Sequence, residues 1–396
     1  MLERVMIISG ESSGELYGAL LAESLISGNP GIRIIGVGGD RMESSGVDLV
    51  SRISSAFGLI EAVRMYGEIR KTFHRVISAL ESFRPQVLVL IDYPDFNMKV
   101  ARSAKRLGIK ILYYVSPQIW AWRRGRIRIL ATLVDMMAVI LPFEEALYRQ
   151  EMVPCEFVGH PVLDEIRGVL QESGLVIDDI GSEDLKAKTR RELGLKPDSP
   201  VMTLMPGSRH HEIDRLLPIM TDVIISMKQT HPDYQFLIPV APNLDRKLIS
   251  RLALLKGCRL LEGETVRCLL ASNLAVIASG TSTLQAAFLK VPTVVVYKLS
   301  PLTYLIGKLI VKVDYISLVN ILIDKSVRDG SGFHIKELLQ GDVSTENIVQ
   351  EIKRIIEDSK YRDELLKQYE RIAYLFSDKK PSLRVAELVK DLAFSA

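Results

Sequence analysis

Residues 87–115 read VLVLIDYPDFNMKVARSAKRLGIKILYYV, and this stretch decides the fold class. Val87–Ile91 and Ile109–Val115 are nearly continuous apolar runs, and a helical pattern from about Met98 to Leu107 lies between them. An apolar strand without polar alternation is typical of a parallel sheet that is covered on both faces. The stretch therefore predicts a strand, a helix and a second strand of one parallel sheet.

Further apolar runs of this kind occur along the whole chain. In the first half they are Val5–Ser9, Ile32–Val37 and Met136–Leu141. In the second half they are Val201–Met205, Gln235–Pro239, Arg259–Leu261, Leu274–Ala278 and Pro292–Tyr297. Because helical patterns alternate with these runs, both halves are predicted to be doubly wound α/β units. Ligands of such sheets bind beyond the carboxyl ends of the strands, so the loops there are the candidate sites.

The pattern lapses at residues 166–198, which hold many charges and a polar helix that ends at Gly194. A chain of 396 residues is long enough for two domains. We expect an N-terminal domain at 1–165, a linker at 166–198, a second domain at 199–365 and C-terminal helices at 366–396.

The composition narrows the class of protein. A net charge of +3 does not indicate a strongly cationic nucleic-acid binder. The three cysteines lack CxxC spacing and the histidines lack HExxH spacing, which argues against a disulfide framework and against a zinc site. We therefore assign no metal. The first residues, MLERVMIISG, do not read as a signal peptide, and we expect a cytoplasmic protein.

Two loops in the first half carry candidate functional residues. The first follows the opening strand and consists of Gly10, Glu11, Ser12, Ser13, Gly14 and Glu15. Its glycines and the following helix would suit an anion, although the spacing fits neither GxGxxG nor a P-loop, and a plain tight turn fits equally well. The second loop, IDYPDFN, holds Asp92 and Asp95, of which one could act as a general base. Asp95 could instead simply cap the following helix.

Two loops in the second half suit a phosphate. One contains Gly207, Ser208 and Arg209, and the other contains Gly280, Thr281 and Ser282. Each follows a predicted strand and leads into a helix, whose first amides attract anions, and an arginine fork matches phosphate oxygens. Together the loops could hold a diphosphate; the alternative is two well-capped helices.

Aromatic and basic residues are interleaved in two further segments. The first holds Trp120, Trp122, Arg123, Arg124 and Arg126; the second holds Arg64, Met65, Tyr66, Ile69, Arg70, Lys71, Phe73 and Arg75. Such segments could contact RNA or an anionic membrane, but they could also be solvated helix faces. His160, in a Gly-His-Pro turn, is expected to be a hydrogen-bonded turn residue.

Nine segments, in one order over nearly the whole chain, resemble the lipid-A-disaccharide synthase family. They are SGESSGELYG, GVGGDRM, IDYPDFN, YYVSPQIWAW, ILPFE, FVGHPVLDE, LMPGSR, ASGTSTLQ and DYISLVNIL. The run VSPQIWAW, with IDYPDFN shortly before it, is the most specific part. The resemblance implies a GT-B architecture, in which two Rossmann-like doubly wound domains face each other across a cleft.

The resemblance also implies a reaction that needs no metal and no cofactor. The family transfers 2,3-diacylglucosamine from UDP-2,3-diacylglucosamine to 2,3-diacylglucosamine 1-phosphate with inversion, and forms lipid A disaccharide 1-phosphate and UDP. Asp95 would take the proton of the acceptor 6-hydroxyl, and Asp92 would act beside it. The UDP phosphates would lie on the Gly207–Arg209 and Gly280–Ser282 loops. Gln285, Asn320 and Gln340 would lie on the nucleotide side, and the Gly10–Glu15 loop on the acceptor side.

The chain departs from the family at four places. Glu15 stands where the family usually has aspartate, and Phe57 replaces a methionine. Gln285 stands where a glutamate normally follows the glycine-threonine loop, which removes a charge on the nucleotide side. The residues Arg328–Ile335 form a glycine-bearing insertion.

The partners implied are the two acylated sugars and the inner leaflet of the membrane. Both substrates carry two acyl chains, so the enzyme would dock on the cytoplasmic face of the inner membrane without spanning it. We favour residues 64–75 as the contact, because the tryptophans lie too close to the catalytic loop. The family also implies a homodimer, and no nucleic-acid partner is expected.

Three rival interpretations stay open at this point. The first is another UDP-sugar enzyme with the GT-B fold, such as a cell-wall glycosyltransferase or an epimerase. The second is a catalytically weak or idle sugar-nucleotide-binding relative, suggested by Gln285 and the insertion. The third is an RNA-binding protein, which would need a wider basic surface.

Overall fold

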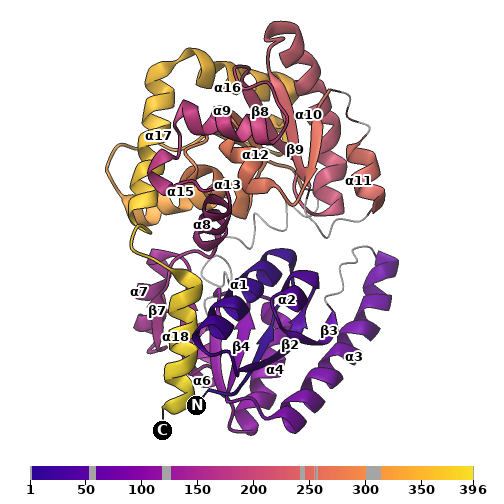
Figure 1. Ribbon diagram of the computed structural model, residues 1–396, viewed down its shortest axis with the longest axis vertical. Coiled ribbons are helices and arrows are strands. Elements are labelled where there is room, and N and C mark those ends of the chain that lie inside the picture. The colour runs from indigo at the N-terminus through magenta and orange to yellow at the C-terminus, as the bar shows by residue number, and fades with distance from the viewer. Residues whose placement is uncertain are drawn as a thin grey trace. The chain divides into compact units, whose positions relative to one another are not determined.

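The computed structural model describes residues 2–52, 59–117, 126–240, 246–253, 255, 257–299 and 314–395, and leaves out the side chains at 12, 59–66, 126 and 246–247. These residues divide into two compact units (Figure 1). Unit 1 comprises Met1–Asp164 and Asp378–Ala396, and unit 2 comprises Glu165–Ser377.

Unit 1 is built on a parallel sheet of seven strands. In sheet order these are β3 (Asp48–Arg52), β2 (Arg33–Gly38), β1 (Arg4–Ile8), β4 (Val87–Ile91), β5 (Lys110–Tyr114), β6 (Met136–Val139) and β7 (Cys155–Phe157). Its helices are α1 (Ser12–Gly28), α2 (Asp40–Ser44), α3 (Leu59–Phe83), α4 (Pro94–Arg106), α6 (Arg126–Leu133), α7 (Pro142–Gln150) and α18 (Pro381–Phe394). The direction of winding reverses between β1 and β4, as in a Rossmann-like sheet.

The core of unit 1 explains why its central strands are apolar throughout. Every side chain of β4 is fully buried. Leu88 and Leu90 pack in one cluster with Val76 and Leu80 of α3. Helix α18 contacts both β4 and β5, and it lies beside α1 (Figure 1). Because helices cover both faces, apolar side chains are favoured at every position of β4, and this confirms the interpretation of VLVLI.

Unit 2 repeats the arrangement with six parallel strands. In sheet order these are β10 (Arg259–Glu262), β9 (Gln235–Val240), β8 (Val201–Met205), β11 (Leu274–Ala278), β12 (Thr293–Tyr297) and β13 (Glu337–Leu339). Its longer helices are α8 (Val162–Glu172), which begins in unit 1, α9 (Glu183–Glu192), α10 (His210–Thr230), α13 (Thr281–Phe288), α16 (Thr345–Glu357) and α17 (Ser359–Tyr374). Its short helical pieces are η1 (Ile177–Asp179), α11 (Arg246–Leu252), α12 (Thr265–Leu270), α15 (Leu318–Leu322), η2 (Ile323–Val327) and η3 (Gln340–Asp342). The winding reverses between β8 and β11.

All ten strands predicted from the sequence are present, and the fold class is confirmed. Three strands were not predicted: β3, β7 and β13, each at an edge of its sheet. An edge strand has a neighbour on one side only and is often short and partly polar. Their sequences, DLVSR, CEF and ELL, therefore lack the apolar run that identifies a central strand.

Residues 166–198, expected to be a linker, contain most of α8 together with α9 and belong to unit 2. The physical reason is Arg190, whose side chain is buried although α9 is otherwise polar. Its guanidinium donates to the carbonyls of Ala271 at 2.9 Å and Pro197 at 2.8 Å, and to Oδ1 of Asn273 at 2.9 Å. Two of these acceptors, Ala271 and Asn273, lie just before β11, so the buried guanidinium fastens this segment to unit 2.

The end of the chain returns to unit 1, which its position in the sequence does not reveal. Arg384 of α18 forms a bidentate ion pair with Glu156, with Nε 2.6 Å from Oε1 and Nη2 3.0 Å from Oε2. The amide of Ser382 donates to Oδ2 of Asp164 at 2.7 Å. Residues more than 200 positions apart thus complete one unit, while α17 stays with unit 2.

Candidate functional site

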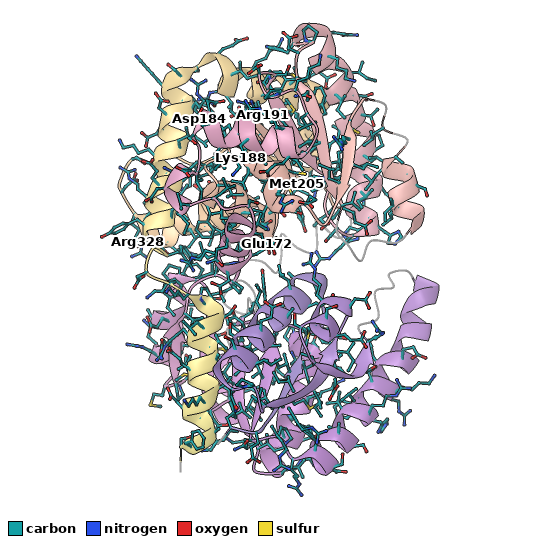
Figure 2. All side chains as sticks on the ribbon, in the orientation of Figure 1. Glu172, Asp184, Lys188, Arg191, Met205 and Arg328 are labelled. Atoms are coloured by element: carbon teal, nitrogen blue, oxygen red, sulfur yellow. The ribbon has the colours of Figure 1, made fainter. Side chains whose placement is uncertain are left out.

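The candidate residues of unit 2 gather at its switch point, where β8 and β11 lie side by side. Met205 ends β8 (labelled in Figure 2), and the Gly207–Arg209 loop leads from it into α10. The Gly280–Ser282 loop leads from β11 into α13. Neighbouring parallel strands that wind in opposite directions leave a crevice beyond their carboxyl ends, and this is where such sheets bind ligands.

The first loop is capped by a carboxylate of its own helix. Glu212, which is 7% exposed, accepts the amides of Ser208 at 3.1 Å and of Arg209 at 3.2 Å through Oε2. Its Oε1 lies 3.5 Å from Nη1 of Arg209. Gly207 has φ +104°, and a Cβ there would meet Oε2 of Glu212 at 2.3 Å, so glycine is required. Two amides of this loop, including that of Ser208, which was expected to bind phosphate, thus already bind an anion of the protein.

The second loop has no such cap. Helix α13 begins with Gly280 as its N-cap, and no side chain of the described residues caps it. The hydroxyl of Thr283 donates to the carbonyl of Gly280 at 2.8 Å, and that of Ser279 donates to the carbonyl of Ile316 at 3.1 Å. The start of α13 therefore offers the positive end of a helix dipole to an anion, with Thr281 and Ser282 in its first turn.

The buried side chain of Asn320 connects two segments of unit 2 by hydrogen bonds. It is 0% exposed, and its Nδ2 donates to the carbonyl of Ile335 and to Oε1 of Glu337, each at 2.8 Å. Its Oδ1 accepts the amide of Ile335 at 2.8 Å. Glu337 also accepts the amides of Ile316 and Ser317, both at 2.9 Å. The side-chain amide of Asn320 thus ties the start of α15 to β13.

The two glutamines expected on the nucleotide side have different surroundings. Gln285 of α13 is 6% exposed, and its Nε2 donates to Oε2 of Glu165 on α8 at 2.7 Å. Glu165 therefore places a carboxylate beside position 285, although the residue at that position is a glutamine. Gln340, which follows β13, pairs with both backbone groups of Leu299 at 3.1 Å when its amide is oriented to donate to the carbonyl.

The candidate residues of unit 1 gather at the second switch point, between β1 and β4. The loop after β1 and the loop after β4 are in contact, because a Cβ on Gly10 would lie within 2.2–2.6 Å of the Tyr93 side chain. Burial and the charge of Glu11 raise the pKa of Tyr93. Glu15 is buried, and its Oε1 accepts the amide of Arg41 at 2.9 Å. This acid therefore caps α2 and holds the loop after β2 against α1.

The IDYPDFN turn has an unusual backbone. Asp92 and Tyr93 have φ of +46° and +48°, and Val115, at the end of the adjacent β5, has φ of +63°. Left-handed conformations of residues other than glycine are uncommon and cluster at functional sites. Tyr93 is the N-cap of α4, so Asp95 is not the cap; it is exposed in the first turn, where the helix dipole favours its charge.

His160 is a turn residue, as the sequence predicted. It is 1% exposed, and its Nδ1 accepts the amide of Val162 at 3.3 Å, which places the proton of the neutral ring on Nε2. Its edge meets the ring of Tyr17, with the centroids 5.9 Å apart. Burial lowers the pKa of His160 to about 3, so the ring is neutral near pH 7.

Several candidates lie outside the described part of the chain. They are Phe57, Trp120, Trp122, Arg123, Arg124 and the side chains of Arg64, Met65, Tyr66 and Arg126. Within the described side chains, Arg70, Lys71 and Arg75 of α3 are exposed, but Phe73 is not part of that surface. It packs in the core against Phe96, with ring centroids 6.1 Å apart.

Four side chains that shape these sites were not singled out from the sequence: Asn97, Glu165, Glu212 and Glu337. Glu212 could have been found, because a glutamate three residues after the N-cap is the signal of a capping box. Glu165 and Glu337 act on segments that are distant in sequence, at 120 and 20–21 residues, and no local pattern indicates such partners.

The described residues contain no group of three or more His, Cys, Asp or Glu side chains that could hold a metal ion. No helix among them is both long enough and apolar enough to cross a membrane.

Two Rossmann-like units with polar loops at both switch points are the architecture of the GT-B glycosyltransferases and related epimerases. The UDP-GlcNAc 2-epimerase from Neisseria meningitidis, solved with bound UDP-GlcNAc, is similar with a TM-score of 0.60 at 14% identity, over 98% of both chains. The glycosyltransferase of kitacinnamycin has a TM-score of 0.58 at 13% identity, also over 98% of both chains. At these identities the likeness shows the fold.

Sequence comparison gives the family. The family model of lipid-A-disaccharide synthetase matches residues 5–384. The lipid-A-disaccharide synthase of Syntrophus aciditrophicus is 42% identical over 89% of this chain and 88% of its own, and that of Myxococcus xanthus is 36% identical over 98% and 97%. The chain belongs to the lipid-A-disaccharide synthetase family, and it is a glycosyltransferase of lipid A synthesis with the GT-B fold.

Proposed function

We propose that this enzyme transfers 2,3-diacylglucosamine from UDP-2,3-diacylglucosamine to 2,3-diacylglucosamine 1-phosphate with inversion of the anomeric centre. The observation that carries the proposal is the match of residues 5–384 to the family. The positions of the polar loops at the switch points of both sheets support it, because these are the places where α/β sheets bind ligands.

The donor diphosphate is assigned to unit 2. The uncapped start of α13 would receive one phosphate through the Gly280–Ser282 loop. The backbone amides of Ser208 and Arg209 bind Glu212, so the contribution of the other loop comes from its side chains, above all from the guanidinium of Arg209. Both groups would stabilise the charge that develops on UDP as it leaves.

The acceptor is assigned to unit 1, with Asp95 as the general base. The acceptor O6 attacks C1 of the donor sugar, the bond from C1 to the phosphate oxygen breaks, and the proton of the 6-hydroxyl passes to the Asp95 carboxylate. UDP leaves with the electron pair of the broken bond. An exposed carboxylate at the start of α4 can reach a substrate without rearrangement of the helix.

The test measures UDP release with both acylated sugars, together with a mass spectrum of the product. Asp95→Asn should keep the fold and UDP binding but lower turnover by about 10²–10⁴-fold, the usual effect of losing a general base. Asp92→Asn, acting through charge and loop shape, should have a smaller effect. Wild-type turnover in the Asp95 variant would exclude this residue as the base, and failure of the native enzyme to release UDP would favour an idle relative.

Docking on an anionic membrane is assigned to α3. Arg70, Lys71 and Arg75 are exposed, and Lys71 and Arg75, four residues apart, lie on one face. Lys71 is also paired with Glu68 at 2.9 Å, which reduces its share. Each basic residue near an anionic leaflet contributes about 1 kcal/mol, and salt screens this attraction.

Co-sedimentation with vesicles that contain anionic lipid tests the docking surface. Neutralising Arg70, Lys71 and Arg75 should weaken binding, and added salt should weaken the binding of the native protein in the same way. A matched variant neutralises three exposed basic residues at α9 of unit 2 and just after it: Lys188, Arg191 and Lys196. Equal binding by the two triple variants would place the contact elsewhere.

A further inference from the structure

The turn that carries Asp95 is held in a conformation that its residues do not favour. Asp92 and Tyr93 are consecutive and both left-handed, with φ of +46° and +48°. For residues with a side chain this conformation is unfavourable, because Cβ comes too close to the following carbonyl oxygen. Aspartate tolerates it better than tyrosine does, because its short polar side chain can bond locally. Two such residues in a row persist only when the surroundings determine the backbone.

Two buried side chains determine it here. The hydroxyl of Tyr113 donates to the carbonyl of Asp92 at 2.6 Å, and Nδ2 of Asn97 donates to the same carbonyl at 2.7 Å. Nδ2 of Asn97 also donates to the carbonyl of Ile91 at 3.2 Å. Tyr113 and Asn97 are both 0% exposed, so the donors of these bonds are shielded from water.

The Asn97 side chain forms hydrogen bonds through its nitrogen and none through its oxygen within the described residues. Its Oδ1 is buried and makes no hydrogen bond within the described residues, while its Nδ2 makes two. A buried amide oxygen without a hydrogen bond is destabilising, so an asparagine that served only to fill the core would be unfavourable here. The cost is understandable if the donor end is the part that matters, since it fixes the last carbonyl of β4 and the first carbonyl of the turn.

Tyr113 and Asn97 together form a clamp on the carbonyl of Asp92, and the position of this carbonyl decides which residue the clamp orients. The peptide that follows Asp92 leads through Tyr93 and Pro94 directly into the first turn of α4, where Asp95 is exposed. Fixing the carbonyl of Asp92 fixes the plane of that peptide, and hence the direction in which the first turn of α4 projects Asp95. Tyr113 reaches the turn from β5, the strand next to β4, so the sheet itself acts as the reference.

We propose that Tyr113 and Asn97 are positioning residues that hold the Asp92–Tyr93 turn and thereby aim Asp95 at the acceptor hydroxyl. This inference rests on the proposed function, in which Asp95 is the base. Misplacement of a reacting group by about 1 Å can cost a factor of about 100 in rate. The clamp therefore contributes to turnover although neither residue touches substrate.

Tyr113→Phe tests the clamp with little risk to the fold. It removes one oxygen, and the carbonyl of Asp92 keeps the bond from Asn97, so no buried group is left without a partner. The matched control is Tyr148→Phe on α7, because Tyr148 is also buried in the core of unit 1 and its hydroxyl makes no hydrogen bond within the described residues. Thermal melts of both variants check that each is folded.

The expected result is a split between rate and binding. In Tyr113→Phe, kcat should fall by about 10–100-fold, while the KM for both sugars and the Kd for UDP stay within about twofold of the control. In the Asp95→Asn background, Tyr113→Phe should cause little further loss, because its effect passes through Asp95. A structural role would lower the melting temperature instead and would add to the loss in the Asp95 variant.

The two proposals fail in different ways. If Asp95→Asn is impaired but Tyr113→Phe turns over like the Tyr148→Phe control, the positioning role is overturned and the base assignment stands. If Asp95→Asn turns over like the native enzyme, the base assignment is overturned, and the positioning role falls with it.

Discussion

Replacing Arg209 by alanine should separate the contribution of this side chain to UDP binding from its contribution to stability. The Arg209 side chain is 41% exposed, and its Nη1 lies 3.5 Å from Oε1 of Glu212. Ion pairs as exposed as this one contribute about 0–1 kcal/mol. The buried carboxylate of Glu212 keeps its two backbone amide donors in the variant, so it is not left unbonded. We therefore expect the free energy of unfolding to change by less than about 1 kcal/mol.

The effect on UDP should be larger. A hydrogen bond between a guanidinium and a phosphate contributes about 1.5–3 kcal/mol, which corresponds to a UDP affinity about 10- to 150-fold lower in Arg209→Ala. Arg209→Lys should recover part of this, because it keeps the charge but loses the planar fork. The loss in kcat/KM should be at least as large as the loss in affinity, since the charge on the leaving group grows in the transition state.

Isothermal titration with UDP at fixed ionic strength measures the affinity, and a thermal melt measures stability. Arg251→Ala is the control, since it also removes one arginine of unit 2 and its ion pair with Asp214 is exposed. Both variants lose one positive charge, so a difference between them reports the location of Arg209 and not the net charge. Equal UDP affinity in the two variants would refute the assignment of the diphosphate to this loop.

Three further predictions concern stability. Burial lowers the pKa of His160 to about 3 from 6.5, so the unfolded chain takes up the proton first as the pH falls. The stability linked to the neutral ring is complete above pH 6.5 and is lost as the pH falls toward 3. At pH 4.5 the loss should be about 3 kcal/mol, and urea unfolding of His160→Gln should show a weaker dependence on acid. Arg190→Met should destabilise unit 2 by about 2–4 kcal/mol without changing UDP affinity, because the carbonyls of Ala271 and Pro197 lose their side-chain donor while Oδ1 of Asn273 keeps only the amide of Val201. An unchanged melting temperature would contradict this. Gln285→Glu would set a second carboxylate 2.7 Å from Glu165 and raise the pKa of one of the two. The melting temperature of the variant should therefore lie further below the native value at pH 8 than at pH 5. Equal differences at both pH values would show that the two carboxylates do not interact.

Ten of the strands, the fold class and the polar loops at the strand ends could be predicted from the sequence. The reason is that a parallel strand covered on both faces is apolar at nearly every position, as in VLVLI, and that signal is local. The order of apolar runs and polar loops placed Gly207–Arg209, Gly280–Ser282 and Asp92–Asp95 at carboxyl ends of strands. The family resemblance followed from these same loops, and the comparisons confirm it.

The tertiary structure alone decided which of these groups are already engaged. Glu212 accepts the amides of Ser208 and Arg209, the side chain of Asn320 bonds to Ile335 and Glu337, and Glu165 brings a carboxylate to Gln285. It also decided the domain to which segments belong, since the buried guanidinium of Arg190 fastens a polar helix to unit 2. A hydrogen bond between residues 120 positions apart leaves no periodic trace in the sequence, because it depends on how two elements pack and not on either element's own pattern.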